Sequence, residues 1–254
     1  MQQNFKPRLK QLILKTYFRY SGLLFGNMDY SRFVVVGHAR TGSNYLLNAL
    51  NQIDSIRIYD EVFAGHNRSI GEGFEKIWRS IFCKQLPNIS AVGFKLFYSH
   101  LSPDEWKEIY TKHDLIWVHL LRRNKLRTLV SLDIAFTTKR WAEKNNTRTF
   151  KPQTIHIEST TILQRIKKLE LMEKSARESL SKHPYIELFY EEMVLDPKNE
   201  IGKIIKFIGV DGAINNERIN MRKQNRSLLK ETIENYNEIA EVLTGTKYED
   251  YLID

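Results

Sequence analysis

Two glycines and the residues between them could bind a phosphate or sulfate group. In the stretch "VVVGHARTGSNYLLNAL" (34–50), Gly37 and Gly42 have the G-x4-G spacing of a phosphate-binding loop. ATP-binding versions of this loop carry lysine where this chain has Ser43. The nearest strong cation is Arg40, and a guanidinium offers a planar fork of donors that matches phosphate or sulfuryl oxygens. The spacing favours an anion site, although an ordinary turn with a surface arginine would contain the same residues.

Thr41, Ser43 and Asn44 would add side-chain donors to the same loop. A turn that leads from a strand into a helix also presents unpaired backbone N–H groups and the positive end of the helix dipole to an anion. Nucleoside triphosphatases need a magnesium site as well, and the sequence places no clear acidic strand end to build one. We therefore expect an anion that is bound by arginine and amide groups without a metal.

A second anion site is indicated in the stretch "HLLRRNKLRTLVSLDIAF" (119–136). An apolar strand pattern is followed by Arg122 and Arg123 and then by a helix pattern. Arg123 and Ser131 are eight residues apart, so they can contact one ligand group only if the turn between strand and helix folds back. Taken alone, Ser131 would be an ordinary helix residue.

Strand and helix patterns alternate along the chain and must position these loops. Short apolar or β-branched runs predict strands at 32–37, 90–97, 115–121 and 185–190. Periodic apolar residues predict helices after 43, at 102–110, from about 126, at 160–183, at 197–208 and at 227–243. Ser102, Pro103 and Glu105 fit the N-cap, the first helical position and the capping-box acid of the second helix.

This alternation predicts an α/β fold, a P-loop-like three-layer domain with a central, mainly parallel sheet flanked by helices. Ligands of such sheets bind at the carboxyl ends of the strands, where loops lead into helix N-termini. We expect residues 31–254 to form this single domain, with a loop or lid at 137–153 and a helical segment at 211–254. Residues 1–30 are basic with short apolar clusters, which predicts a helical extension.

The charge balance favours anionic partners without choosing among them. The chain has 39 Lys and Arg against 30 Asp and Glu, a net charge of +9. Nucleic acid is not expected as a partner, because the sequence has no aromatic–basic repeat, zinc-finger spacing or helix-turn-helix pattern. The basic residues are also spread along the chain with acids among them. Acidic lipid and phosphorylated or sulfated small molecules are the other anionic partners, and the charge alone does not choose between them.

The sequence also predicts a cytoplasmic protein. No apolar run approaches the roughly 20 residues that span a membrane. Residues 1–30 lack the long apolar segment and cleavage site of a secretory signal. Cys83 is the only cysteine, so no intramolecular disulfide can form. The basic extension is compatible with contact at a membrane surface, and it could also mediate a homodimer.

The two anion motifs together resemble those of sulfotransferases that use 3′-phosphoadenosine 5′-phosphosulfate (PAPS). The segment "RTGSNYLLNAL" is similar to their 5′-phosphosulfate loop, and "RRNKLRTLVS" has the Arg-x7-Ser spacing of their 3′-phosphate motif. The resemblance extends to "YDEVF", "GFKLFYSH", "YEEMVLDPKNEIGKIIKFIGV" and "RKQNRSLLKETIENYNEI". It is strongest to the bacterial branch that includes Nod-factor and trehalose sulfotransferases. That branch begins the loop with arginine, whereas the cytosolic animal enzymes use lysine there.

The resemblance implies that the chain binds PAPS and releases 3′-phosphoadenosine 5′-phosphate (PAP), with no metal. Arg40 would take the electrostatic role of the missing lysine and neutralise the leaving group. The remaining donors to the 5′-phosphate would be backbone amides and side chains of the same loop and the helix that follows, namely Thr41, Gly42, Ser43, Asn44 and Tyr45.

By the same resemblance, Arg123 and Ser131 would bind the 3′-phosphate that distinguishes this donor from ADP-like nucleotides. Lys223 and Gln224 would close over the nucleotide from the C-terminal segment. Charge-assisted hydrogen bonds contribute about 1.5–3 kcal/mol each, so two separate anchors could give useful affinity. Read without the resemblance, Lys223 is an ordinary solvated charge.

A general base is needed as the acceptor loses its proton during sulfuryl transfer. In the matching bacterial branch the glutamate of "YDEVF" is the proposed base, which makes Glu61 the candidate here. An exposed loop carboxylate is the alternative interpretation of that residue. His100 is a second catalytic candidate, and His66 and His119 are further rivals, because other sulfotransferases use histidine. Lys95 could contact the sulfuryl group or the acceptor, or simply end a strand.

By the resemblance, we expect the acceptor to be a hydroxyl of a carbohydrate or glycolipid first. A hydroxyl or amine of a small metabolite is the next expectation. Two other classes of protein stay open at this point. A divergent P-loop kinase would need ATP and magnesium, and a non-catalytic basic module would bind anions through many dispersed contacts. Both would share the positive charge of this chain, and neither needs the Arg-x7-Ser spacing.

Overall fold

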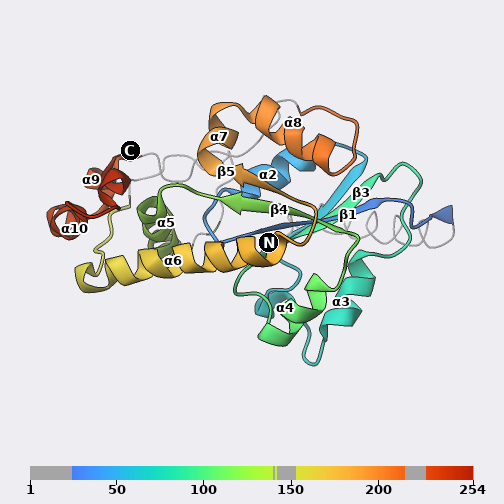
Figure 1. Cartoon of the computed structure of the whole chain (residues 1–254), viewed down its shortest axis with the longest axis horizontal. Helices are drawn as coiled ribbons and strands as arrows, with labels where there is room; N and C mark the ends of the chain where they lie inside the picture. The colour runs from blue at the N-terminus through green and yellow to red at the C-terminus, as the bar shows by residue number, and fades with distance from the viewer. Residues whose placement is uncertain (1–24, 140, 142–152, 215–226, 254) are drawn as a thin grey trace, which may run out of the picture.

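Five parallel strands form one sheet at the centre of the protein (Figure 1). The computed structural model describes residues 25–139, 141, 153–214 and 227–253. In chain order the strands are β1 (Ser31–Gly37), β2 (Ile56–Tyr59), β3 (Ala91–Phe97), β4 (Leu115–Leu121) and β5 (Tyr185–Phe189). They lie in the order β2-β3-β1-β4-β5, and every neighbouring pair is parallel. The strand that carries the predicted anion loop, β1, is therefore the central one.

Helices cover both faces of the sheet (Figure 1). One layer contains α2 (Ser43–Leu50), α7 (Tyr190–Leu195) and α8 (Pro197–Phe207). The opposite layer contains α3 (Phe74–Ile81), α4 (Pro103–Tyr110) and α6 (Ser159–Leu180). Side chains alternate along β1, so that Phe33 and Val35 join the first core and Val34 and Val36 join the second. The predicted three-layer α/β fold with a parallel sheet is confirmed.

A third apolar core lies beside the sheet, where α5 (Lys125–Thr138) packs on α6. It is completed by α9 (Leu229–Thr232), α10 (Tyr236–Leu243) and the 3-10 helix η3 (Glu249–Leu252). Lys247 Nζ and Tyr248 Oη each donate to Glu170 Oε2 on α6 at 2.8 Å. These contacts fix the last part of the chain against the two helices that follow the second predicted anion motif.

The register of the sheet brings the predicted loops to one edge, the one formed by the carboxyl ends of the strands. Gly37, the last residue of β1, lies opposite Phe97 of β3 and Leu120 of β4. β2 ends at Tyr59, opposite Phe94 of β3. Because all strands are parallel, the segments that follow their carboxyl ends leave the sheet on the same side. This edge therefore collects residues that are far apart in the sequence.

The four predicted strands are confirmed, with boundaries that differ by at most one residue. The predicted start of α4 is confirmed as well. There Ser102 Oγ accepts the N–H of Glu105, and the Glu105 carboxylate accepts the N–H of Ser102, which is the predicted capping box. Three elements were not predicted, namely β2, α3 and α7. β2 has only four residues, which is too short to show a clear alternation, whereas α3 buries Phe74, Ile77, Trp78 and Ile81 at helical spacing.

The prediction of one continuous helix over 227–243 was wrong. The chain forms α9 and α10 with an extended stretch between them, because this stretch pairs with residues near 155. The N–H of Ile155 donates to Thr232 O at 2.8 Å, and the N–H of Glu234 donates to Ile155 O at 3.0 Å. Asn235 then bonds both the N–H and the carbonyl of Ile157 through its side chain. Tertiary pairing overrides local helix propensity here.

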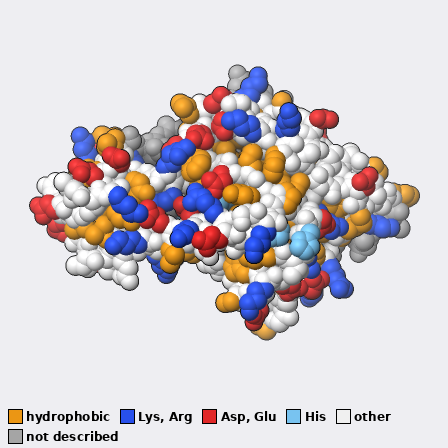
Figure 2. Space-filling view, in the orientation of Figure 1, with side chains coloured by type: hydrophobic (Ala, Val, Ile, Leu, Met, Phe, Trp, Pro, Cys, Tyr) orange, Lys and Arg blue, Asp and Glu red, His pale blue; other side chains and the backbone are white. Residues whose placement is uncertain are grey.

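The predicted loop at 137–153 begins later than expected, because α5 continues to Thr138. Lys139 ends the helix in the left-handed conformation, with a φ angle of 55°. Most of the remaining loop and residues 1–24 of the predicted extension lie outside the described residues. The helices that the structure describes include none that is both long and apolar enough to cross a membrane. On the face in Figure 2, basic and acidic side chains lie interspersed.

Candidate functional site

The two glycines of the first motif are held by contacts that exclude any side chain. A Cβ on Gly37 would lie 2.4 Å from the carbonyl oxygen of Leu120 on the neighbouring strand. Gly42 has a φ of 91°, and a Cβ there would lie 2.4 Å from the ring of Tyr190. Both positions therefore need glycine, one for close strand packing and one for a left-handed turn. The G-x4-G spacing marks a tightly built loop, which we call the 38–43 loop.

The 38–43 loop leads directly into the first turn of α2. Gly42 is the N-cap and has no side chain to satisfy the N–H groups of that turn. Thr41 Oγ1 donates to His38 O at 2.8 Å and closes the loop on itself. Ser43 is buried at the first helical position, and Tyr45 is half-buried against the core. The geometry offers an anion the free N–H groups and the positive end of α2.

Arg40 connects the 38–43 loop to α5. Its backbone is left-handed, with a φ of 69°, which is a strained conformation for a residue with a side chain. Its Nε donates to Ser131 Oγ at 2.9 Å across 91 residues of sequence, and its Nη1 donates to Trp141 O at 2.7 Å. The structure thus brings together Arg40 and Ser131, one residue from each predicted motif.

The two arginines at the end of β4 have opposite environments. Arg123 turns outward, where its guanidinium pairs with Glu192 and stacks on the Phe189 ring at 3.9 Å. Arg122 is buried, donates from Nη1 to Arg40 O at 3.3 Å, and stacks on the Tyr190 ring at 4.7 Å. The arginine that contacts the 38–43 loop is therefore Arg122, which the sequence did not single out as a site residue.

Arg40, Arg122 and a third arginine on α5, Arg127, form a group of neighbouring positive charges. Burial is the main cause that lowers the pKa of each guanidinium, and repulsion from Arg122 adds to it at Arg40 and at Arg127. Tyr190 lies among them, and burial raises the pKa of its phenol. We call Arg40, Arg122, Arg127, Ser131 and Tyr190 the Arg122 cluster.

A second polar cluster surrounds Lys95, which is 1% exposed at the carboxyl half of β3. Its Nζ donates to Asn44 Oδ1 at 2.9 Å and lies 2.6 Å from Asp60 Oδ1 and 2.8 Å from Glu61 Oε1. One buried ammonium therefore meets an amide from the start of α2 and two carboxylates from the segment after β2. Together with His100 these residues form the Lys95 cluster.

The backbone around Glu61 is fixed by the turn that follows β2. Glu61 has a φ of 21°, and its carbonyl accepts the N–H of Ala64 and the Asn67 side chain, each at 2.9 Å. Phe63, two residues on, is fully buried in the second core. The turn directly follows β2, a strand that the sequence analysis did not predict. The Glu61 carboxylate is 25% exposed, so a substrate can reach it.

His100 lies beside Glu61 but has the wrong protonation pattern for a base. Its Nδ1 accepts the N–H of Phe97 at 3.1 Å, which leaves the proton of the neutral ring on Nε2. Nε2 is 3.7 Å from Glu61 Oε2. Burial lowers the pKa of His100 to about 4, so the ring is neutral near pH 7. A neutral imidazole with a proton on Nε2 can orient a carboxylate and cannot accept a proton at that nitrogen.

The other two histidine rivals differ from each other. His66 lies in an exposed 3-10 turn, η1 (Gly65–Asn67). His119 is fully buried on β4, where Nε2 is 2.6 Å from Tyr98 Oη and Nδ1 is 3.3 Å from Glu187 Oε1. Burial lowers the pKa of His119 to about 4. The contacts of His119 join strands β3, β4 and β5 and give it a structural role.

The sequence missed three members of the Arg122 cluster, namely Arg122, Arg127 and Tyr190. Each had a visible signal, since Arg122 directly precedes the Arg-x7-Ser motif, Arg127 lies within it, and Tyr190 opens the family-like segment "YEEM". Lys223 and Gln224, predicted to close over the nucleotide, lie outside the described residues. Their assignment stays a prediction.

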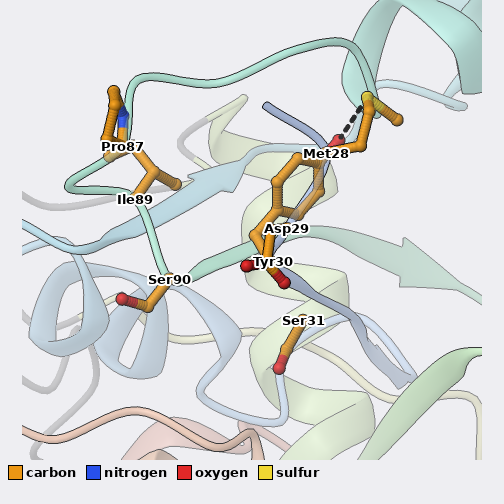
Figure 3. Close-up of a pocket in the computed structure, with 7 residues that line it drawn as sticks. All are labelled: Met28, Asp29, Tyr30, Ser31, Pro87, Ile89 and Ser90. Carbon is orange, nitrogen blue, oxygen red and sulfur yellow. Dashed lines mark hydrogen bonds between the residues drawn. The ribbon is translucent and has the colours of Figure 1, made fainter. Parts of the chain in front are cut away.

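An open depression of about 530 Å³ lies at the opposite edge of the sheet (Figure 3). It is lined by the residues that enter β1 and β3, namely Met28, Asp29, Tyr30, Ser31, Pro87, Ile89 and Ser90. Seven residues of β1 separate it from the 38–43 loop, a distance of roughly 20 Å at the usual rise of a strand. The polar clusters described above are therefore elsewhere, at the carboxyl edge.

Fold and site together define a class: a parallel α/β domain whose central strand leads into a glycine-bounded loop that contains an arginine. Comparison with known proteins refines this class. The family described as "Sulfotransferase domain" matches residues 31–247, and the chain belongs to this family. None of the curated proteins compared with the sequence matches it.

Two solved structures are similar to this chain. One is the crystal structure of a sulfotransferase from Alicyclobacillus acidocaldarius, with 18% identity over 88% of this chain and 95% of that chain and a TM-score of 0.49. The other is the mouse sulfotransferase SULT7A1 complexed with PAP, with 17% identity over 79% of this chain and 64% of that chain and a TM-score of 0.41. The protein is a sulfotransferase by its family match, which covers the whole sheet and both polar clusters.

Proposed function

We propose that this sulfotransferase moves the sulfuryl group of PAPS to a hydroxyl or amine of a carbohydrate, a glycolipid or a small metabolite. The observation that carries the proposal is the hydrogen bond from Arg40 Nε to Ser131 Oγ at 2.9 Å. It supports a single binding place for a ligand with two phosphate groups, because it joins the loop proposed for the 5′ end to the helix proposed for the 3′ end. The Lys95 cluster lies next to the same loop through Asn44.

In this proposal the 5′-phosphate lies over the first turn of α2. The free N–H groups of that turn and the Ser43 hydroxyl are its donors, while the Thr41 hydroxyl, which donates to His38 O, holds the loop in shape. Ser131 and Arg123 bind the 3′-phosphate. Arg123 is 54% exposed and paired with Glu192, and an exposed pair of this kind is worth only about 0–1 kcal/mol, so a phosphate can replace the carboxylate.

The transfer step forms a bond between the acceptor oxygen and sulfur while the bond from sulfur to the bridging phosphate oxygen breaks. The bonding electrons stay on the bridging oxygen, which leaves as part of PAP. We assign Arg40 to neutralise the charge that develops there, because its bonds to Ser131 Oγ and Trp141 O hold its guanidinium at the 38–43 loop. Lys95, which donates to Asn44 beside the same loop, stabilises the negative charge on the sulfuryl oxygens during the transfer.

The acceptor proton goes to the Glu61 carboxylate. Glu61 is the partly exposed acid of the Lys95 cluster, and its contact with the buried Lys95 ammonium at 2.8 Å fixes one carboxylate oxygen. Its other oxygen faces His100, which is neutral and orients it. We therefore assign Glu61 as the general base, the role that the sequence suggested for it, and His100 as a positioning residue in place of its suggested catalytic role.

The acceptor class is supported by an exposed aromatic pair beside Arg40. Phe136, near the end of α5, and Trp141 are 62% and 46% exposed, and their rings meet edge to face at 5.0 Å. Trp141 also accepts the Arg40 hydrogen bond through its carbonyl. An apolar ring surface at the reacting centre suits the C–H face of a sugar or another ring that carries the hydroxyl.

The test is a transfer assay with the purified full chain, radiolabelled PAPS and a panel of glycans and hydroxylated metabolites. A thermal-shift series with PAP, its 3′-dephospho analogue and ATP–magnesium accompanies it. We expect PAP to raise the melting temperature most, and at least one acceptor to become labelled. Stabilisation by ATP–magnesium alone would instead identify a kinase. Equal weak shifts with every anion would identify a non-catalytic binding module.

A further inference from the structure

Arg122 is a buried charge without a full set of partners. Its side chain is 10% exposed, and its Nε is buried with no hydrogen-bond partner among the described residues. The nearest carboxylate oxygen in an ion pair with it is Glu191 Oε1, 4.0 Å from Nε. Buried polar groups are nearly always hydrogen-bonded, and an incompletely paired buried charge costs stability. Such a residue calls for an explanation beyond packing.

The surroundings of Arg122 supply only part of the negative charge that would balance it. Arg40 and Arg127 are positively charged neighbours and repel it. Glu191 favours the charged form of Arg122, but it lies 4.0 Å from Nε, and its oxygens accept the backbone N–H of Arg123, at 3.1 Å on both, and that of Asn124, at 3.4 Å. Among the described residues, Arg122 therefore lacks a carboxylate at hydrogen-bonding distance.

A neighbouring residue shows what a purely structural buried cation looks like in this protein. Lys125 is three residues further on, is 6% exposed, and pairs with Glu173 Oε1 on α6 at 2.6 Å. Its Nζ also donates to the carbonyl of Arg122. The charge of Lys125 is thus neutralised within the fold, whereas the charge of Arg122 is not.

Arg122 supports the 38–43 loop directly at one place and through Tyr190 at another. Its Nη1 donates to the carbonyl of Arg40, the residue with the strained left-handed backbone. Its guanidinium also covers the Tyr190 ring, and that ring occupies the space next to Gly42. Both the middle and the end of the loop are consequently held against Arg122.

We propose that Arg122 is a positioning residue for the phosphate groups of the donor: it braces the 38–43 loop and supplies incompletely paired positive charge behind it. This rests on the proposed function, since it assumes a donor with several phosphate charges. The nucleotide-free protein carries the cost of the buried charge, and the bound polyanion offsets it. Stability without ligand and affinity for ligand are therefore opposed at this residue.

The test compares Arg122→Met with wild type in two measurements on the full chain. Methionine keeps much of the side-chain volume and removes the charge. We expect the melting temperature without nucleotide to stay unchanged or to rise by a few degrees, and the affinity for PAP to fall by roughly tenfold or more. Arg122→Lys, which keeps the charge and loses the fork of donors, should fall between the two proteins in affinity.

Two matched variants separate this result from a general packing effect. Lys125→Met leaves Glu173 buried and unpaired, so it should lower the melting temperature clearly. Arg165→Met removes an arginine of α6 that is paired with Asp133 of α5 at 2.6 Å. This variant should leave PAP affinity unchanged. Among these variants, we expect only Arg122→Met to lose PAP affinity without a fall in melting temperature.

Two outcomes would overturn the inference. One is unchanged PAP affinity in Arg122→Met, and the other is a loss of affinity accompanied by a lower melting temperature without nucleotide, as for a structural residue. The wild-type protein keeps this test separate from that of the proposed function. If wild type shows no stabilisation by PAP, the donor assignment fails; if wild type binds PAP and Arg122→Met binds it equally, only the role of Arg122 fails.

Discussion

The Lys95 cluster and the Arg122 cluster lie on the same edge of the sheet and differ in their charge balance. In the Lys95 cluster, one buried ammonium meets two carboxylates, an amide and a neutral imidazole. In the Arg122 cluster, three guanidiniums surround a tyrosine and a serine, and burial and mutual repulsion disfavour their charge. Lys95 is fully paired within the protein, whereas Arg122 has a buried Nε without a hydrogen-bond partner among the described residues.

This difference separates two tasks of a transferase. A group whose ammonium is fully paired and that has a reachable carboxylate suits proton transfer, because the acid keeps a defined position before the substrate arrives. A group with excess positive charge suits the binding of a polyanion, whose own charge completes it. Asn44 connects the two, since it starts α2 beside the 38–43 loop and accepts from Lys95. The predictions below test each cluster for the task assigned to it.

The largest expected effect is at Glu61. Glu61→Gln keeps the shape of the side chain and removes the proton acceptor, so we expect kcat to fall by about 10²–10⁴-fold, the usual contribution of a general base. PAP affinity should change little, because the Arg122 cluster is untouched. Initial rates with labelled PAPS and calorimetric titration with PAP measure the two quantities.

Asp60→Asn is the matched control, because Asp60 shares Lys95 with Glu61 and its side chain is far more exposed, at 67%. A small effect of Asp60→Asn beside a large one of Glu61→Gln would assign the base. If Glu61→Gln retained most of its turnover, the Lys95 cluster would have a structural role only.

The next largest effect is on stability at Gly42. Gly42→Ala combines a left-handed backbone, which costs about 1–2 kcal/mol for a residue with Cβ, with a clash at 2.4 Å against Tyr190, and overpacking of that kind costs about 1–3 kcal/mol more. Urea unfolding should show the sum. Gly71→Ala is the control, because Gly71 also has a positive φ, of 73°, with nothing within 4 Å. An equal loss at both glycines would mean that Tyr190 does not pack tightly on the loop.

Local features of the first motif were readable from the sequence, because each depends on a short stretch of chain. The spacing of Gly37 and Gly42 reports strand packing and a turn, and the structure requires glycine at both. The capping box at Ser102 is equally local and is confirmed. The Arg-x7-Ser spacing placed Ser131 at the same site as Arg40, although it gave no geometry for the turn.

Other features depend on contacts between distant segments and could not be predicted. Which of Arg122 and Arg123 faces the loop is decided by one residue of register at the end of β4, together with carboxylates on α7. The Lys95 cluster gathers residues that follow three different strands. The break between α9 and α10 results from pairing with a segment about 80 residues earlier.

A smaller effect is expected where the 3′-phosphate is assigned. Arg123→Ala should weaken PAP binding by about 10–100-fold, the equivalent of one or two charge-assisted hydrogen bonds, and should hardly alter binding of the 3′-dephospho analogue. Glu192→Gln should act in the opposite direction and tighten PAP binding by up to about fivefold, because it frees Arg123 from its exposed ion pair. Isothermal titration with both nucleotides measures the differences. If Arg123→Ala lost affinity equally for the two nucleotides, Arg123 would not bind the 3′-phosphate. Arg122 would then be the next candidate for that role.

The smallest effect concerns the pH dependence of stability in the Lys95 cluster. Burial lowers the pKa of His100 to about 4 in the folded protein, from an ordinary value of 6.5. Above pH 6.5 the ring is neutral in both the folded and the unfolded state and contributes nothing. Between pH 6.5 and 4 the unfolded state binds the proton more readily, so the free energy of unfolding falls as the pH falls, by about 2 kcal/mol at pH 5.

His119 has the same sign and window, because burial also lowers its pKa to about 4. His100→Gln should therefore reduce, and not abolish, the loss of stability between pH 7.5 and pH 5, as measured by urea unfolding at both values. Glutamine keeps an acceptor for the N–H of Phe97, so the loop after β3 has the means to hold its shape. The members of the Arg122 cluster are arginines, a serine and a tyrosine, none of which titrates in this window. If His100→Gln lost as much stability between pH 7.5 and pH 5 as wild type does, this histidine would be solvated in the folded protein. The argument that it is a neutral partner of Glu61 would then fail.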